Sequence, residues 1–270
     1  MLLRILLALA LVFVLPLVAL AQTGDAGDGV IQGRVVNGTR AGEGVASLEV
    51  TLKVLVHDGH EAAPVVARTD GQGYFIFEGL STRAENIYEV SAVYQGTEYQ
   101  GEQVGFSAGS TDVLTEIVVY DSTSSDEAIK VARAHTIVLP GDDGLVVTEY
   151  FLLVNESNLT FVGAPSGGSG GKNATVKFAL PQGATGVEFS DGLDDCCATV
   201  QDGAITDSLP LLPGTREIAF TYEVPSSREP FIFSRQLQYP TDGYDFLVRS
   251  ATAEISSQLL RKEEPRSVAG

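Results

Sequence analysis

A short stretch between Thr69 and Leu80 constrains the fold more than any other part of the chain, and it reads TDGQGYFIFEGL. Its glycines Gly71 and Gly73 can adopt the positive φ angles of a tight turn. The aromatic and β-branched residues that follow, Tyr74–Phe77, suit a pleated strand. Gly79 then ends the apolar run. The stretch therefore predicts a turn, a strand and a second turn in a β domain, and it indicates no reaction.

The rest of the chain repeats this pattern. Short runs of alternating apolar and polar residues are separated by Gly, Pro, Asp and Asn, and no helical periodicity persists. The clearest run is Arg216–Val224, in which Ile218, Phe220, Tyr222 and Val224 share one side. Alternation of this kind is typical of an antiparallel sheet over a single core. The sequence therefore predicts an all-β protein.

The N-terminus has the features of an export signal. Arg4 precedes an apolar run from Ile5 to Leu15, and Ala19-Leu20-Ala21 matches the small-x-small cleavage pattern. A retained membrane anchor is the alternative, because the apolar segment approaches the ~20 residues that span a bilayer. Pro16 and the cleavage pattern favour a signal peptide at residues 1–21. We expect an extracytoplasmic protein, secreted into the periplasm or to the cell surface, that is not an integral membrane protein after cleavage.

The predicted mature chain is strongly acidic. Arg4 is the only charged residue of the signal, which leaves 16 basic and 35 acidic residues and a formal charge of −19. Such a chain repels phosphate backbones and anionic lipid surfaces, so nucleic-acid partners and peripheral membrane binding are disfavoured. The acidity has two interpretations, which are solubility and calcium binding.

The first predicted domain contains four motifs in a fixed order. These are Ile31–Val35, Val45 with Val50–Leu52, the stretch from Thr69, and Tyr88–Gly96. In this order they resemble the carboxypeptidase regulatory-like domain, a prealbumin-like β-sandwich, over residues 29–120. The resemblance implies a non-catalytic accessory or adhesion-type module, and the wider superfamily includes starch-binding-like sandwiches.

A polar Ser/Thr/Asp segment separates this domain from a second all-β region. In that region we expect a hairpin around Pro140–Gly144 and further strands at Phe231–Tyr239 and Phe246–Ile255. The full prediction is two consecutive antiparallel β-sandwich domains. Its limits are a signal peptide at 1–21, a linker at 22–28, a carboxypeptidase regulatory-like sandwich at 29–120, a linker at 121–127, a second sandwich at 128–258 and a disordered tail at 259–270.

Two cysteines are adjacent, at Cys196 and Cys197. Neighbouring α-carbons lie ~3.8 Å apart, which is below the usual separation for a disulfide. The alternatives are a strained vicinal disulfide, two free thiols or a bridge to another chain. A locally stabilised loop is favoured over a redox or metal role, because the neighbouring aspartates are hard oxygen donors that match thiolates poorly.

Other candidate sites are weaker. Ser169 lies in a G-x-S-x-G match inside a Gly-rich loop with no helix after it, so a flexible loop is favoured over a hydrolase elbow. His57 and His60 flank a turn but have no visible third ligand for a metal. The Asp-Gly pairs, such as Asp70-Gly71, are explained by turn chemistry. Calcium through aspartate oxygens is an alternative. We predict no catalytic residues, no cofactor and no metal site.

Carbohydrate binding would require exposed aromatic rings that stack on sugars. The candidates are Tyr94 and Tyr99, which flank one hairpin, and Tyr239 and Tyr244, which bracket another. Two functional hypotheses remain. The first is a secreted or envelope, non-enzymatic module for adhesion, scaffolding or surface display, with a cell-surface protein or polysaccharide as partner. The alternative is a carbohydrate-binding accessory protein.

Overall fold

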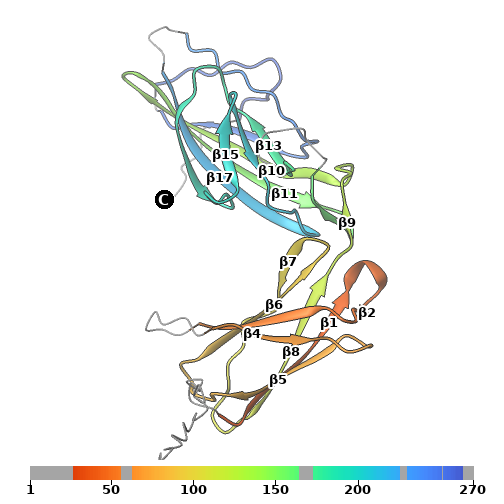
Figure 1. Ribbon diagram of the computed structural model, residues 1–270. Helices are drawn as coiled ribbons and strands as arrows, with labels where there is room; N and C mark the ends of the chain where they lie inside the picture. The colour runs from red at the N-terminus through yellow and green to blue at the C-terminus, as the bar shows by residue number, and fades with distance from the viewer. Residues whose placement is uncertain (1–26, 56–62, 164–172, 226–229, 251, 264–270) are drawn as a thin grey trace, which may run out of the picture.

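The computed structural model describes residues 27–55, 63–163, 173–225, 230–250 and 252–263. The protein is all-β, as predicted, and its strands form two sandwiches that lie end to end (Figure 1). Buried apolar side chains form one cluster in each sandwich, the first between Ile31 and Val119 and the second between Ile129 and Val224. The exact domain limits given above stay a prediction.

The first sandwich packs two sheets face to face. In one, β1 lies between β5 and β8 and also pairs with β2, and in the other the strand order is β4-β3-β6-β7. The elements are β1 (Gly29–Asn37), the 3-10 turn η1 (Gly38–Arg40), β2 (Glu43–Gly44), β3 (Glu49–Leu55), β4 (Val65–Arg68), β5 (Tyr74–Leu80), β6 (Ile87–Tyr94), β7 (Thr97–Gln100) and β8 (Asp112–Val119).

The stretch from Thr69 to Leu80 forms the predicted turn and strand. The Asp70 carboxylate accepts hydrogen bonds from the backbone N–H groups of Gln72 and Tyr74, both at 2.9 Å, so it stabilises the turn itself. Gly73 has a φ of +88°, a conformation that favours glycine. Phe75 and Phe77 then point into the core. Asp70 is therefore a turn residue in this structure.

The second sandwich combines a five-stranded sheet, in the order β14-β17-β11-β10-β18, with a three-stranded sheet, β13-β16-β15. The elements are β9 (Ser122–Thr123), β10 (Ile129–Gly141), β11 (Gly144–Asn155), β12 (Thr160–Phe161), β13 (Val176–Ala179), β14 (Thr185–Asp191), β15 (Ala198–Gln201), β16 (Ala204–Asp207), β17 (Gly214–Pro225) and β18 (Tyr244–Val248). The predicted hairpin is β10–β11, and the predicted alternation of Arg216–Val224 is that of β17.

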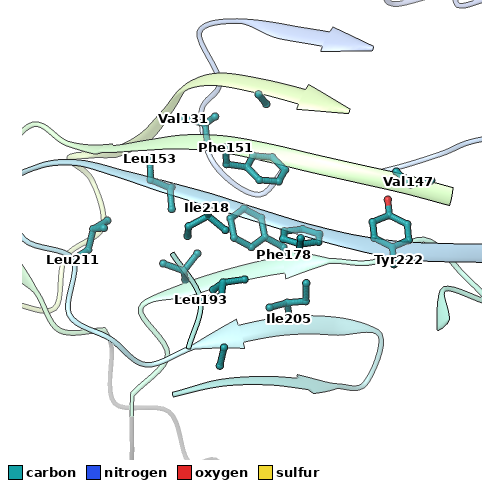
Figure 2. Close-up of a cluster of buried hydrophobic side chains, with 14 of the residues drawn as sticks. Val131, Val147, Phe151, Leu153, Phe178, Leu193, Ile205, Leu211, Ile218 and Tyr222 are labelled. Atoms are coloured by element: carbon teal, nitrogen blue, oxygen red, sulfur yellow. The ribbon is translucent and has the colours of Figure 1, made fainter. Parts of the chain in front are cut away.

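Aromatic rings fill the space between these two sheets. Phe178 lies 4.5 Å from Phe151 and 5.5 Å from Phe220 between ring centroids. Figure 2 shows Phe151, Phe178 and Tyr222 pointing into the same layer from different strands. Rings of this size dominate the free energy of a core, so we expect this cluster, rather than a disulfide framework, to stabilise the second domain.

Three details differ from the prediction. The strand predicted at Phe246–Ile255 is instead β18, which begins at Tyr244 and ends at Val248, and residues 249–250 and 252–255 form no strand. Phe231–Tyr239 is irregular rather than a strand, because side chains there replace a backbone ladder. The Tyr239 hydroxyl and the Gln238 side chain accept hydrogen bonds from the N–H groups of Lys177 and Ala179, at 3.0 and 3.2 Å. In addition, the pairs β1–β8, β10–β18 and β9–β12 are parallel, whereas the other strand pairs of the described residues are antiparallel.

No helix within the described residues is long and apolar enough to cross a membrane. The predicted signal peptide, His57, His60 and Ser169 lie outside the described residues.

Candidate functional site at the junction of the two sandwiches

The chain connects the two sandwiches through a short strand rather than a free linker. β9 pairs with β12, a strand of the segment that follows β11. The N–H of Thr160 donates to the Asp121 carbonyl at 2.9 Å, and the N–H of Val162 donates to the Thr123 carbonyl at 3.0 Å. A strand of the second sandwich therefore pairs with the connection between the two sandwiches.

The Asp121 carboxylate is the centre of this junction. Its Oδ1 accepts hydrogen bonds from Tyr94 at 2.8 Å, Asn37 at 2.9 Å and Gln95 at 3.2 Å. Its Oδ2 pairs with the Arg40 guanidinium at 3.0 Å. Hydrogen bonds to a charged group are stronger than neutral ones, so one carboxylate ties β1, η1, the β6–β7 hairpin and the connection together.

Asn37 prepares this arrangement locally. Its side-chain oxygen accepts the N–H groups of Thr39 and Arg40 at 2.8 and 3.2 Å and so caps η1. The capped turn presents Thr39 to the second sandwich, where its hydroxyl donates to the Asn158 carbonyl at 2.5 Å. The same hydroxyl accepts the N–H of Asp121 at 2.9 Å. The Asn37-Gly38 pair thus forms a capped 3-10 turn.

A buried pair completes the contact. The hydroxyl groups of Tyr99 and Thr160 share a hydrogen bond of 2.7 Å, and the Tyr99 hydroxyl also donates to the Tyr120 carbonyl at 3.0 Å. Burial raises the pKa of Tyr99 above its ordinary value. Tyr99 is only 2% exposed, which leaves no ring face for a sugar.

The contacts of the junction favour the ionised form of Asp121. Its partial burial acts to raise its pKa, but the hydrogen bonds from Tyr94, Asn37 and Arg40 outweigh that effect and hold the pKa below its ordinary value. The carboxylate is therefore the form that the junction stabilises. Sequence reasoning placed Asp121 in a linker because nothing local shows that four distant donors converge on it.

The other tyrosines predicted to stack on sugars are also engaged. Tyr94 is half-buried against Asp121. In the second sandwich, the half-buried Tyr239 hydroxyl accepts the Lys177 N–H, and the Tyr244 hydroxyl shares a hydrogen bond of 2.8 Å with Thr136. Together with Tyr99, these three side chains anchor segments of the chain to one another. The exposed tyrosines on the sheet faces include Tyr74 and Tyr150 instead.

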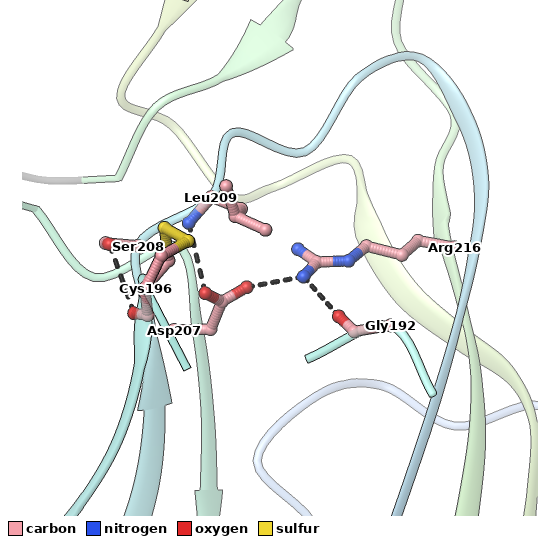
Figure 3. Close-up of a disulfide and its surroundings, with 7 residues drawn as sticks. Gly192, Cys196, Asp207, Ser208, Leu209 and Arg216 are labelled. Carbon is pink, nitrogen blue, oxygen red and sulfur yellow. Dashed lines mark hydrogen bonds and ion pairs between the residues drawn. A yellow bond between two sulfur atoms is a disulfide. The ribbon is translucent and has the colours of Figure 1, made fainter. Parts of the chain in front are cut away.

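In the structure, Cys196 and Cys197 form a vicinal disulfide on the loop before β15 (Figure 3). The N–H of Cys197 donates to the Asp194 carbonyl at 2.9 Å. The Cys197 carbonyl accepts both the N–H and the hydroxyl of Ser208, each at 3.2 Å. Cys197 is thus bonded both within its own loop, to Asp194, and to Ser208, the residue that follows β16.

A buried ion pair holds the start of this loop. Arg216 on β17 pairs with the Asp207 carboxylate at 2.6 Å and donates to the Gly192 carbonyl at 2.5 Å (Figure 3). The Asp207 side chain is completely buried, and it also accepts the N–H of Leu209 at 3.2 Å. Arg216 therefore connects the large sheet, the small sheet and the disulfide loop.

A second buried ion pair lies inside the second core. Glu149 on β11 is fully buried, accepts the Tyr222 hydroxyl at 2.5 Å and pairs with Arg235. The Arg235 guanidinium also lies over the Phe151 ring, 4.9 Å from its centroid. Burial lowers the pKa of Arg235 to about 10 and raises that of Tyr222. The pair anchors the irregular segment 230–243 to the large sheet.

Metal ligation finds no support in the described part of the chain, where no group of three or more His, Cys, Asp or Glu side chains could hold an ion. Calcium binding stays an alternative, and the absence of a cofactor stays a prediction.

Comparison with known proteins gives fold similarity only. No family model and no curated protein matches the chain. Solved structures that resemble it include the major pilin SpaD of Corynebacterium diphtheriae, with 17% identity over 75% of this chain and 59% of the pilin and a TM-score of 0.29. The pilin SpaA of the same organism has 13% identity over 75% of this chain and 59% of the pilin, with a TM-score of 0.26.

A DUF3823 family protein of Parabacteroides merdae is similar at 11% identity, over 75% of this chain and 83% of that protein, with a TM-score of 0.26. The chain thus spans about three fifths of the two pilins. At these identities and TM-scores, no functional property of these proteins is carried over to this chain. The resemblance to the carboxypeptidase regulatory-like domain also stays at the level of the β-sandwich.

Proposed function

We propose that the protein is an extracytoplasmic, non-catalytic scaffold or surface-display module that holds two β-sandwiches in one fixed arrangement. The observation that carries this proposal is the junction around Asp121. Domains of one chain normally move relative to each other unless their interface restrains them. Here the connection is paired to β12. Thr39 and Tyr99 of the first sandwich form hydrogen bonds to the second sandwich, and the backbone of Asp121 in the connection accepts a hydrogen bond from it.

The buried ionisable groups also fit a structural role. Glu149 and Asp207 are the charged residues that the described chain buries completely, and each faces an arginine. Such pairs fasten segments together and present neither a free nucleophile nor a free base to a substrate.

The junction is expected to loosen when its centre is removed. Spin labels at Glu78→Cys and Asp143→Cys, attached without reductant, report the distance between the sandwiches by pulsed electron resonance. We expect a narrow distribution at pH 7 and a clearly broader one in Asp121→Ala/Thr39→Val. Glu98→Gln removes an exposed carboxylate of β7 that makes no hydrogen bond or ion pair within the described residues, and it should leave the distribution unchanged.

The same measurement has a pH dependence. Because the pKa of Asp121 is lowered from 3.8, its contribution is present above that value and is lost as pH falls through the lowered pKa. The wild-type distribution should therefore be narrow well above pH 3.8 and should broaden as pH is lowered stepwise below that value. A distribution that is already broad at pH 7, or one that Asp121→Ala/Thr39→Val leaves narrow, would contradict the proposal.

Carbohydrate binding is the second candidate function, and one observation favours it. Tyr74 is 54% exposed on the outer face of the β5–β1–β8 sheet, where Arg34 lies over its ring, 5.3 Å from the centroid. Gln32 and Glu116 lie on the same face. An exposed ring beside planar polar groups can stack on and hydrogen-bond to a sugar.

A polysaccharide pull-down or glycan array with the mature chain tests this candidate. If the protein binds carbohydrate, it is retained on at least one glycan. Tyr74→Ala then lowers this retention at least tenfold, whereas Tyr150→Ala does not. Lack of retention on every glycan would rule it out.

A further inference from the structure

The outer face of the five-stranded sheet has the wrong polarity for a face exposed to water. On β11 the buried side chains include the charged Glu149, whereas Val146, Tyr150, Leu152 and Val154 point outward. An antiparallel sheet with one solvated face normally alternates apolar side chains inward and polar ones outward, and strands that are apolar on both faces are typically covered on both. β11 is thus built like a strand that has a layer on each side.

The neighbouring strands extend this apolar surface. Leu139 on β10 pairs with Val146, and Ile137 pairs with Leu247 on β18. Cross-strand partners share one face of a sheet, so these residues are contiguous with Tyr150 over β11, β10 and β18, which lie side by side (Figure 1). Leu139, Val146, Tyr150 and Leu247 are between 37% and 46% exposed. We call this surface the β11 strip.

Carboxylates line one long side of the strip. Glu223 pairs with Val146 and Glu217 with Leu152, both on β17, while Glu188 on β14 pairs with Thr221. All three are exposed, and within the described residues they make no ion pair. The two glutamates of β17 are six residues apart, which is roughly 20 Å along a strand. On the opposite side, Asp245 pairs with Arg133 at 3.7 Å and lies 3.2 Å from His135.

This charge pattern selects the occupant. Two copies of the strip would bring uncompensated carboxylates together in a chain whose net charge is −18, and such like-charge contacts oppose association. A helix laid on an open sheet face is an ordinary third layer, and roughly 20 Å corresponds to about 13 helical residues.

We propose that the β11 strip is a docking surface for a cationic amphipathic helix of a partner protein, whose apolar side covers Val146 and Tyr150 and whose Lys or Arg side chains face Glu217 and Glu223. The proposal names the kind of partner that the second sandwich would bind, and so it rests on the proposed scaffold function. The spin-label distances test the junction alone and the peptide titrations below test the strip alone, so failure of one proposal can be distinguished from failure of the other.

A fluorescent 14-residue helical peptide with Leu at the i, i+3, i+4 and i+7 positions and Lys elsewhere serves as the probe. Anisotropy titrations of the full chain should show saturable binding that weakens as salt is raised. We expect at least tenfold weaker binding for Val146→Ser/Tyr150→Ser and for Glu217→Gln/Glu223→Gln. Circular dichroism checks that each variant is folded.

The matched control is Glu98→Gln/Glu102→Gln, which removes the same charge from exposed positions of the first sandwich. Unchanged binding there supports the proposal. Equal weakening in both charge variants would mean non-specific attraction to an acidic protein and would overturn it. Absence of peptide binding at low salt would overturn the proposal as well. So would a result in which Val146, Tyr150, Glu217 and Glu223 matter for binding of a cationic polysaccharide such as chitosan but not for binding of the peptide.

Discussion

Glu149→Gln is expected to lower the free energy of unfolding of the second sandwich by about 3–5 kcal/mol, the usual cost of removing one partner of a buried ion pair. The substitution keeps the volume of the side chain but leaves the Arg235 guanidinium in the core without its counter-charge. Arg235 has few alternatives, because it lies over Phe151 and is almost fully buried. The effect should be confined to the second sandwich, since its core cluster is separate from that of the first.

Hydrogen exchange followed by mass spectrometry across a urea series measures this effect domain by domain. Domain-resolved data are needed because a two-domain chain does not unfold as a single two-state unit. The double variant Glu149→Met/Arg235→Met removes both charges, and it should recover most of the lost stability, since apolar replacements of buried pairs are often neutral or stabilising. Equal losses in the single and double variants would show that the charge pair is not the cause.

Local patterns were sufficient where each strand faces one core. The turn glycines and aromatic residues of Thr69–Leu80 predicted β5, and the alternation of Arg216–Val224 predicted β17. Both succeed because a strand that is buried on one face has an apolar side chain at every second position. Phe231–Tyr239 has a similar composition but forms no strand, because Tyr239 and Gln238 satisfy the edge of β13 with side chains instead.

The sites could not be predicted in the same way, since their partners are far apart in the sequence. Tyr94 and Tyr99 flank a hairpin and so resembled exposed rings, yet that hairpin points into the junction and meets Asp121 and Thr160. Glu149 interrupts an apolar run, which signals a special position, but its partner Arg235 could not be identified from spacing. A polar residue within an apolar strand is a signal that would have singled out Glu149, but it would not have found Asp121, which lies between β8 and β9.

Arg216→Met is expected to destabilise the second sandwich by a similar amount, about 3–5 kcal/mol, because it leaves the completely buried Asp207 carboxylate without its cation. It also removes the hydrogen bond to Gly192, which begins the loop that carries Cys196 and Cys197. We therefore expect faster hydrogen exchange at 192–198 and faster reduction of the disulfide by dithiothreitol, because a loosened loop gives the attacking thiolate better access.

Arg133→Met is the matched control. Arg133 is half exposed and lies 3.7 Å from Asp245, so the loss of its charge should lower the free energy of unfolding by less than about 1 kcal/mol. If both substitutions have the same effect on stability and on the reduction rate, the Asp207–Arg216 pair is not what holds the disulfide loop in place.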